Sequence, residues 1–217
     1  MSDPLPARRA LLTAGLVAVS VLAAGCSADD ARPVGQAPSV AGSPSSDGTS
    51  TDAWVRGLDR PTGIGFALPE AARPARSTRP AQGGAEVVSR EYAAAVGDVR
   101  LSVSVLTTPT QPAAVRRTVR AQYLPFLVVD TVQAQGASEA GVVSNSRLRG
   151  VGLRGYDSQL TFVQKDRRAV WFTRAVELPR TVVVAQAVAY VRPDEDAVDR
   201  VRAQFRRLTD GLDIPTS

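Results

Sequence analysis

The segment Tyr156–Val191, YDSQLTFVQKDRRAVWFTRAVELPRTVVVAQAVAYV, predicts three antiparallel strands joined by two turns. Its first part, 156–164, alternates Tyr, Ser, Leu and Phe with Asp, Gln and Thr, which is the period of a strand with one buried face. Lys165-Asp166-Arg167 and Pro179-Arg180 interrupt the pattern and predict turns, so that 169–178 and 181–191 are the second and third strands. The third is apolar at nearly every position, and we expect both of its faces to be covered.

Upstream segments extend this sheet. Val142–Arg149 is predicted as the strand that precedes the three, and Thr62–Leu68 as a short strand ending before Pro69. The segments 85–95 and 99–107 flank the turn Val96-Gly97-Asp98 and predict a hairpin. The intervening segment 70–84 is interrupted by prolines and glycines and predicts a loop.

Two segments have helical periodicity. The first runs from 111 to about 135. Within it, Pro125 must kink the helix or start a second one, because its ring clashes with a preceding backbone carbonyl. The pair Val128-Val129 also fits a strand. The second, Pro193 to about Asp210, places acidic residues in its first turn and arginines in its last, which complements the helix dipole. Its apolar stripe predicts that Phe205 packs on the sheet. The order of elements predicts an α+β fold, an antiparallel β-sheet with helices packed against it.

Residues 1–25 have the order of an export signal. Arg8-Arg9 precede an uncharged apolar run, Ala10–Ala24, and small residues lead into Cys26, which is the single cysteine of the chain. The run would span about 22 Å as a helix, which is short for a hydrocarbon core of about 30 Å. A secretory signal followed by a chance cysteine and an uncleaved anchor are the alternatives.

This segment resembles the bacterial lipoprotein signal, in which small residues lead to an obligatory cysteine. The resemblance implies cleavage between Gly25 and Cys26 and a diacylglyceryl group on the Cys26 thiol, which anchors the protein to the cell membrane on its extracytoplasmic side. The chain departs from the pattern at Ala23, where leucine is favoured. Arg8-Arg9 also resemble a twin-arginine signal, so the choice between the two export routes stays open.

Residues 26–52 are rich in Ser, Gly, Pro and Ala and predict a flexible tether, while 53–217 form one globular domain. The chain contains no histidine, and its one cysteine is assigned to lipid. These absences exclude Ser-His-Asp and Cys-His nucleophile pairs, His or Cys metal sites and an internal disulfide, and we expect no cofactor and no metal. The net charge is +5 for the whole chain and, with 23 basic and 16 acidic residues, +7 for the domain. For an exported domain this charge favours anionic lipid or envelope polymer as partner, with no nucleic acid.

The domain resembles the PsbP-like fold and, within it, the LpqN-type actinobacterial lipoproteins. The resemblance rests on Phe66-Ala67-Leu68-Pro69, on the segment 149–156 that leads into a strand, on the three-strand meander, and on the helix after Pro193. It implies an α/β/α sandwich used for binding or assembly at membranes, and it brings no catalytic residues. We therefore expect a non-catalytic domain that binds an envelope protein, lipid or glycan.

The alternative function is an envelope hydrolase that uses paired carboxylates. Four acidic residues of predicted strands are its candidates: Glu86, Glu91, Asp157 and Glu177. Two of them facing each other in a cleft at about 5 to 10 Å would favour this function. Solvated positions on the sheet are the simpler interpretation of all four.

A candidate contact for an anionic ligand is formed by Arg73, Arg76 and Arg79, which recur at every third position between prolines. Polyproline II has three residues per turn, so this conformation would align the three side chains along one edge. A solvated basic loop is the alternative interpretation.

Three other features have simpler explanations. Gly150-Val151-Gly152-Leu153-Arg154-Gly155 matches the dinucleotide motif, but a strand follows it where that motif requires a helix. Lys165 could pair with a serine as a nucleophile, but it lies in a predicted turn, where we expect it to be exposed. Trp171 is predicted to be a core residue, whereas Trp54 stays open as a candidate for sugar stacking.

Overall fold

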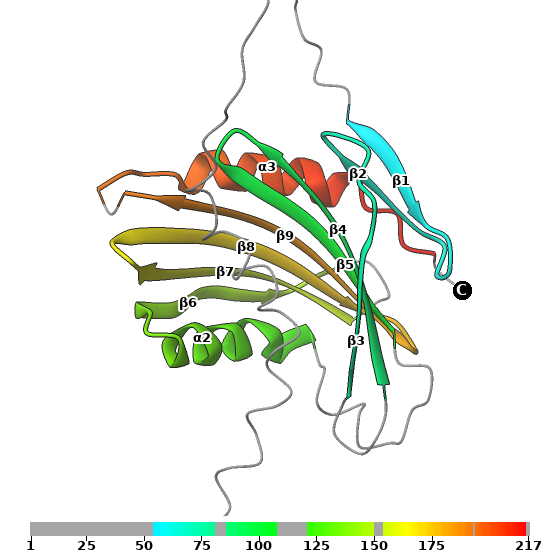
Figure 1. Ribbon diagram of the computed structural model, residues 1–217, viewed down its shortest axis with the longest axis horizontal. Coiled ribbons are helices and arrows are strands. Elements are labelled where there is room, and N and C mark those ends of the chain that lie inside the picture. The colour runs from blue at the N-terminus through cyan, green and yellow to red at the C-terminus, as the bar shows by residue number, and fades with distance from the viewer. Residues whose placement is uncertain (1–53, 81–85, 108–120, 150–153, 193, 216–217) are drawn as a thin grey trace, which may run out of the picture.

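The structure, a computed structural model, describes residues 54–80, 86–107, 121–149, 154–192 and 194–215 (Figure 1). The predicted signal peptide, Cys26 and the tether lie outside these residues, as do 111–120 of the first predicted helix. No helix within the described ranges combines the length and the apolar character needed to cross a membrane.

Seven strands form one antiparallel sheet. Across the sheet they follow the order β3 (Ala75–Pro80), β4 (Glu86–Val96), β5 (Val99–Thr107), β9 (Thr181–Val191), β8 (Arg167–Glu177), β7 (Arg154–Gln164) and β6 (Ser138–Arg147). The predicted meander is confirmed as β7–β8–β9, and the predicted hairpin as β4–β5.

Tight turns fix these hairpins. Lys165 and Asp166 connect β7 and β8 with φ of 50° and 59°, the left-handed conformation that a two-residue turn requires when its twist matches that of the strands. Gly97, between β4 and β5, has φ of 57°, a conformation that glycine adopts without steric cost. The turn positions inferred from sequence are therefore correct.

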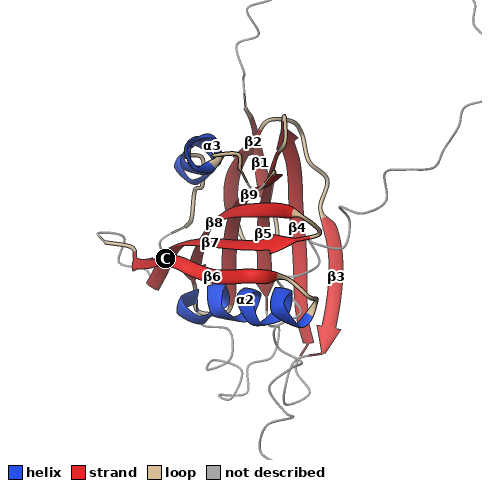
Figure 2. Cartoon of the chain, turned by 90° about the vertical axis from the view of Figure 1, so that its left-hand side faces the viewer, coloured by secondary structure: helices blue, strands red, loops and turns tan. Residues whose placement is uncertain are grey.

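Two helices cover opposite faces of the sheet (Figure 2). Trp171 and Phe172 are neighbours on β8, so their side chains point to opposite faces. Phe172 stacks on Phe205 of α3 (Val198–Asp210), with ring centroids 5.7 Å apart. Trp171, 1% exposed, packs in the cluster that contains Val128 and Val132 of α2 (Leu124–Ala134). The α+β prediction, the core position of Trp171 and the docking of Phe205 are confirmed.

A second, two-stranded sheet lies on the α3 side of the molecule. It is a hairpin of β1 (Val55–Asp59) and β2 (Ile64–Leu68), and Phe66 of β2 contacts Tyr92 of β4 with ring centroids 4.5 Å apart. The segment after α3 pairs with the same hairpin through Gly65 and Asp213. The sequence predicted β2 and missed β1.

Two predicted boundaries were wrong, and one open alternative is decided. The segment 70–84 contains the edge strand β3 rather than only a loop, because antiparallel pairing with β4 satisfies its backbone. The second helix begins at Val198, so Asp194, Glu195 and Asp196 precede it instead of occupying its first turn. In the first helical segment, α2 begins at Leu124 with Pro125 in its first turn and continues through Val128 and Val129. Pro125 therefore starts a helix, and the strand alternative is excluded.

On the α2 face, a row of polar side chains crosses five strands. Its members lie opposite one another in register: Ser102 on β5, Gln186 on β9, Thr173 on β8, Ser158 on β7 and Asn145 on β6. The first four are at most 5% exposed. The Ser158 hydroxyl donates to Asn145 Oδ1 at 2.9 Å. The row separates the cluster around Trp171 from a second apolar cluster around Ala175 and Val184.

Candidate functional site

A groove lies beside α3, where the helix leaves the outer strands of the sheet uncovered. The helix packs on β5, β8 and β9, whereas β7 and β6 continue beyond it. Two surface pockets of about 390 and 380 Å³ occupy this region, and Gln159 of β7 lines both of them. Because they share this residue, the pockets lie end to end along β7. We call the pair the α3 groove.

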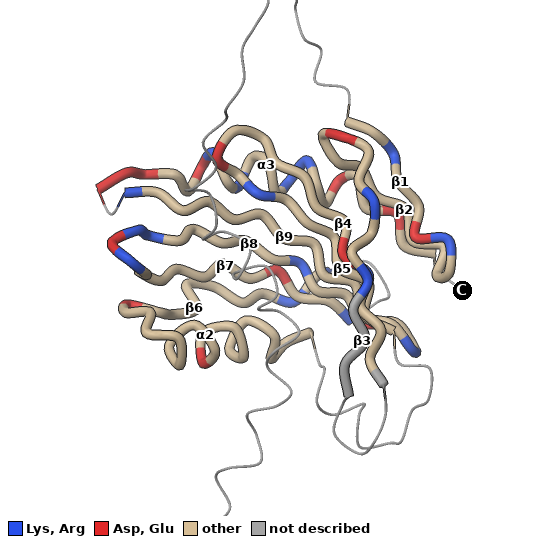
Figure 3. Tube along the Cα trace, viewed as in Figure 1, with Lys and Arg blue, Asp and Glu red and all other residues tan. Residues whose placement is uncertain are grey.

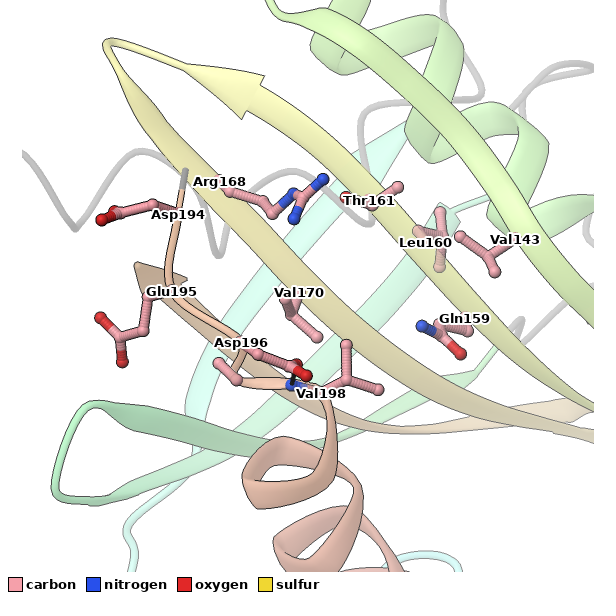
Figure 4. A pocket seen from close by; sticks show the side chains of 11 residues that line it. Val143, Gln159, Leu160, Thr161, Arg168, Val170, Asp194, Glu195, Asp196 and Val198 are labelled. Carbon is pink, nitrogen blue, oxygen red and sulfur yellow. Dashed lines mark hydrogen bonds between the residues drawn. The ribbon is translucent and has the colours of Figure 1, made fainter. Parts of the chain in front are cut away.

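The first pocket, shown in Figure 4, is acidic and lies at the start of α3. Asp194, Glu195 and Asp196 line it from the segment before the helix, and Arg168 of β8 is its one cationic side chain. Asp196 accepts a hydrogen bond at 3.0 Å from the backbone N–H of Val198, where the helix begins. Among the described residues, no group of three or more acidic residues or cysteines is arranged to hold a metal ion.

The second pocket is basic and lies along α3. Its charged lining residues are three arginines, Arg174, Arg202 and Arg206, and one carboxylate, Asp157. Arg174 and Asp157 face each other on β8 and β7 and form two hydrogen bonds of 2.8 Å. The hydrogen bonds to Asp157 raise the pKa of Arg174 above its already high ordinary value, although burial opposes the change.

The remaining polar groups of the basic pocket come from β6, β7 and α3. Ser144 and Ser146 are exposed on β6, and Gln159 lies between the two pockets. On α3, the Arg202 guanidinium lies 5.5 Å from the centre of the Phe172 ring and donates to Asp199 at 2.8 Å. Figure 3 shows charged residues of both signs along α3 and in the segment before it. The groove thus offers hydrogen-bonding and charged groups over an apolar floor.

Of the four carboxylates proposed for a hydrolase, the three whose side chains the structure describes do not come together. Asp157 lies on the α3 face in its ion pair, whereas Glu177 accepts a 2.6 Å hydrogen bond from the N–H of Ala121 on the other face. Glu91 also points away from α3, but β5 and β9 separate its strand from that of Glu177, a spacing of about 14 Å. The side chain of Glu86 lies outside the described part of the structure.

The three arginines of the proposed anionic contact do not lie on a polyproline II segment. Arg73 precedes β3, and Arg76 and Arg79 belong to it. A strand repeats every two residues, so a spacing of three does not align side chains along one edge. Arg73 and Arg76 are exposed. The predicted polyproline II conformation was therefore wrong, whereas contact between these arginines and an anionic ligand stays a prediction.

The other sequence motifs keep their simpler interpretations. The segment after the glycine-rich motif is β7, so that no helix begins there; residues 150–153 of the motif lie outside the described ranges. Lys165 is exposed in the β7–β8 turn, as predicted. Trp54 packs against the core on the α3 side, with the guanidinium of Arg207 4.7 Å from the centre of its ring.

The chain is similar in fold to known structures. These include cyanobacterial PsbP (CyanoP) from Synechocystis, with 15% sequence identity over 80% of this chain and 98% of that chain and a TM-score of 0.47. They also include LpqN of Mycobacterium tuberculosis, a protein involved in cell envelope biogenesis, with 15% identity, 77% and 87% coverage and a TM-score of 0.36. A protein of unknown function from Pseudomonas aeruginosa has 11% identity, 76% and 98% coverage and a TM-score of 0.34. No protein-family model and no curated protein matches the chain.

Both families that the sequence resembles, PsbP and LpqN, are among these similar folds. The α3 groove itself was not predicted. Its basic pocket contains Arg202 and Arg206, which recur at a spacing of four on α3, and the alternating Ser144 and Ser146 on β6. Both patterns are present in the sequence. They indicate only an exposed helix face and an exposed strand face until the fold brings the two together.

Proposed function

We propose that the chain is a lipid-anchored protein of the bacterial cell envelope whose domain binds a polar ligand in the α3 groove without transforming it. The anchor in this proposal is Cys26, and the domain faces the extracytoplasmic side. The ligand is an envelope component, either a protein segment, a glycan or the polar part of a lipid.

The observation that carries the proposal is the pair of oppositely charged pockets arranged end to end along β7. Their walls provide carboxylates, guanidinium groups, hydroxyls and an amide, which are groups that orient a polar ligand through hydrogen bonds. A fully embedded acyl chain would leave these groups without water and without partners, at a cost of about 1 to 3 kcal/mol for each. The groove therefore favours a polar, extended ligand.

A photo-crosslinking experiment tests this proposal in native membranes. A photoreactive amino acid replaces Ser146, which is exposed in the basic pocket, and irradiation follows in intact cells. The matched control carries the same amino acid in place of Asp130, which is exposed on α2 on the opposite side of the sheet. We expect an adduct of defined mass from position 146 and none from position 130. Equal adducts from the two positions, or none from 146, would contradict the proposal.

A further inference from the structure

We infer that the basic pocket of the α3 groove binds a phosphate-type oxyanion. This inference rests on the proposed function and deepens it, because it names the chemical group that the groove recognises. The site consists of Arg174, Arg202 and Arg206 together with the hydroxyls of Ser144 and Ser146.

Two of the three guanidinium groups are held in place by the protein itself. Arg174 is fixed through its Nε and Nη2 atoms, which donate to the two carboxylate oxygens of Asp157. Arg202 lies over the Phe172 ring, and Phe172 is in turn stacked on Phe205. An oxyanion that binds here does not have to order these side chains, so it loses less entropy on binding than it would at a flexible surface site.

The third guanidinium carries a charge that the protein does not neutralise. Arg206 is exposed one helical turn after Arg202 and forms no ion pair with any residue that the structure describes. The carboxylate of Asp157 is already occupied by Arg174, and that of Asp199, the partner of Arg202, is 91% exposed and therefore screened by solvent. Asp210 also acts on Arg174 through its charge, but it does not line the pocket, whose lining of three arginines and one carboxylate keeps an excess of positive charge.

The geometry of these donors favours an oxyanion. A guanidinium presents planar pairs of N–H groups that match the oxygens of phosphate, and serine hydroxyls add single donors. Gln159 lines both this pocket and the acidic one, so the remainder of a larger molecule can extend along β7. Two sources present this chemistry: the phosphodiester of a lipid headgroup, and a soluble phosphate monoester or inorganic phosphate.

The test is a titration of the full-length ¹⁵N-labelled protein in a nonionic detergent, followed by backbone amide chemical shifts. One arm uses inorganic phosphate, and the other uses glycerophosphoglycerol, the deacylated headgroup of phosphatidylglycerol. We expect the amides of Ser144, Ser146 and Gln159 to shift with saturation. The double variant Arg202→Gln/Arg206→Gln should weaken binding at least tenfold. Arg56→Gln, which removes an exposed arginine on β1, should leave the affinity unchanged.

Tighter binding of glycerophosphoglycerol would identify a lipid headgroup as the source, and tighter binding of phosphate a soluble one. Because Arg202 contacts the core residue Phe172, the single variant Arg206→Gln is measured as well, and it should weaken binding without changing the melting temperature. Binding of neither probe, or equal affinity in wild type and Arg206→Gln, would overturn the inference. If position 146 still captures a ligand in that case, the proposed function stands and only the oxyanion is wrong.

Discussion

Arg90 and Asp59 form a bidentate ion pair that joins the small sheet to the large one. Arg90 Nε and Nη2 donate to the two Asp59 oxygens at 2.6 and 2.9 Å, and the Tyr92 hydroxyl donates to the same carboxylate at 2.8 Å. Thr62 also donates to it. Burial alone would raise the pKa of Asp59, but the hydrogen bonds from Arg90, Thr62 and Tyr92 lower it below its ordinary value. Burial and the hydrogen bond to Asp59 raise the pKa of Tyr92 to about 12.

Replacing Arg90 by methionine should lower the free energy of unfolding by about 3 to 5 kcal/mol, because it leaves the fully buried Asp59 carboxylate without its cation. Denaturant titration at pH 7 measures this difference. A matched variant is Arg56→Met on β1, whose exposed side chain should change stability by less than about 0.5 kcal/mol.

Acid pH provides a second control for this pair. Since the pKa of Asp59 is lowered in the folded state, its stabilisation is complete above the unfolded pKa of about 3.9 and disappears as pH falls below it. The difference between wild type and Arg90→Met should therefore narrow as the pH falls below about 4. A difference that stays constant over this range would show that lost packing, and not the ion pair, causes the destabilisation.

Glu91→Gln should stabilise the protein at neutral pH. Burial raises the pKa of Glu91, an effect that the nearby Arg100 opposes, and its Oε1 atom is buried without a hydrogen-bond partner. A raised folded-state pKa means that folding favours the protonated acid, so stability is lost as pH rises above the unfolded pKa of about 4.3. Urea titrations should give a more stable variant at pH 7 and equal stabilities below about pH 4. A variant that is less stable at pH 7 would contradict this assignment.

Phe205→Ala should cost about 3 to 5 kcal/mol, the usual range for a buried phenylalanine. The ring is 6% exposed and stacks on Phe172, so its removal leaves a gap between α3 and the sheet. Thermal unfolding monitored by circular dichroism measures the loss. Arg206→Ala, one residue further on the exposed face, is the control and should melt close to wild type. Similar melting temperatures for the two variants would mean that α3 contributes little to the core.

Cys26→Ala should leave the precursor uncleaved, because the thiol that accepts the lipid is lost. Intact-mass measurement of protein from membranes should show residues 1–25 retained in the variant. In the wild type it should show a chain that begins at Cys26 and carries lipid. Two acyl chains suffice for stable anchoring, so the wild type should also stay with membranes after a salt wash. An unmodified Cys26 thiol in the native protein would disprove the predicted anchor.

Changing Arg73, Arg76 and Arg79 to serine should abolish salt-sensitive association of the chain 27–217 with anionic liposomes. Each arginine near such a surface contributes about 1 kcal/mol, so three contribute about 3 kcal/mol at modest salt. Flotation of liposomes at two salt concentrations measures the association. Arg202→Gln/Arg206→Gln provides the comparison, since it removes charge from the basic pocket instead. Unchanged flotation of the triple variant would assign these arginines no part in membrane contact.

The strands that could be predicted from the sequence are those whose own residues show a strand pattern of hydrophobicity. In β5 and β7 the apolar side chains alternate with polar ones, and in β9 the run of valine and alanine is itself diagnostic of a buried strand. The missed strands lack that pattern. β3 ends in Pro80 and contains two arginines, features that protect the edge of a sheet and resemble those of a loop. β1 is short and mostly exposed, so only its pairing with β2 defines it.

The groove could not be predicted because its residues are distant in the sequence. Ser144 and Ser146 belong to an exposed strand face, and Arg202 and Arg206 to an exposed helix face, and each face alone suggests contact with water. Only the path of α3, which covers β8 and β9 but not β6, turns the two faces into walls. Asp157 was recognised as a strand carboxylate, but its partner Arg174 lies on the next strand and became evident only from the register.

The buried Gln186 also distinguishes the native register of β9 from registers that are shifted along its neighbouring strands. Around it the strand is a nearly uniform run, VVVAQAVAYV, in which a shift by two residues would preserve most apolar contacts. Gln186 breaks that degeneracy, because in its native place it faces Ser102 and Thr173 across the two neighbouring strands. A shift by one residue would turn its amide to the α3 face, into the cluster that contains Ala185 and Ala187, and a shift by two would place it where Val184 or Val188 packs beside Ala175 or Trp171. The Oε1 atom of Gln186 is buried without a hydrogen-bond partner even in the native alignment, so what favours this alignment is the polar row on both sides of the amide, which a shifted strand would replace by apolar side chains.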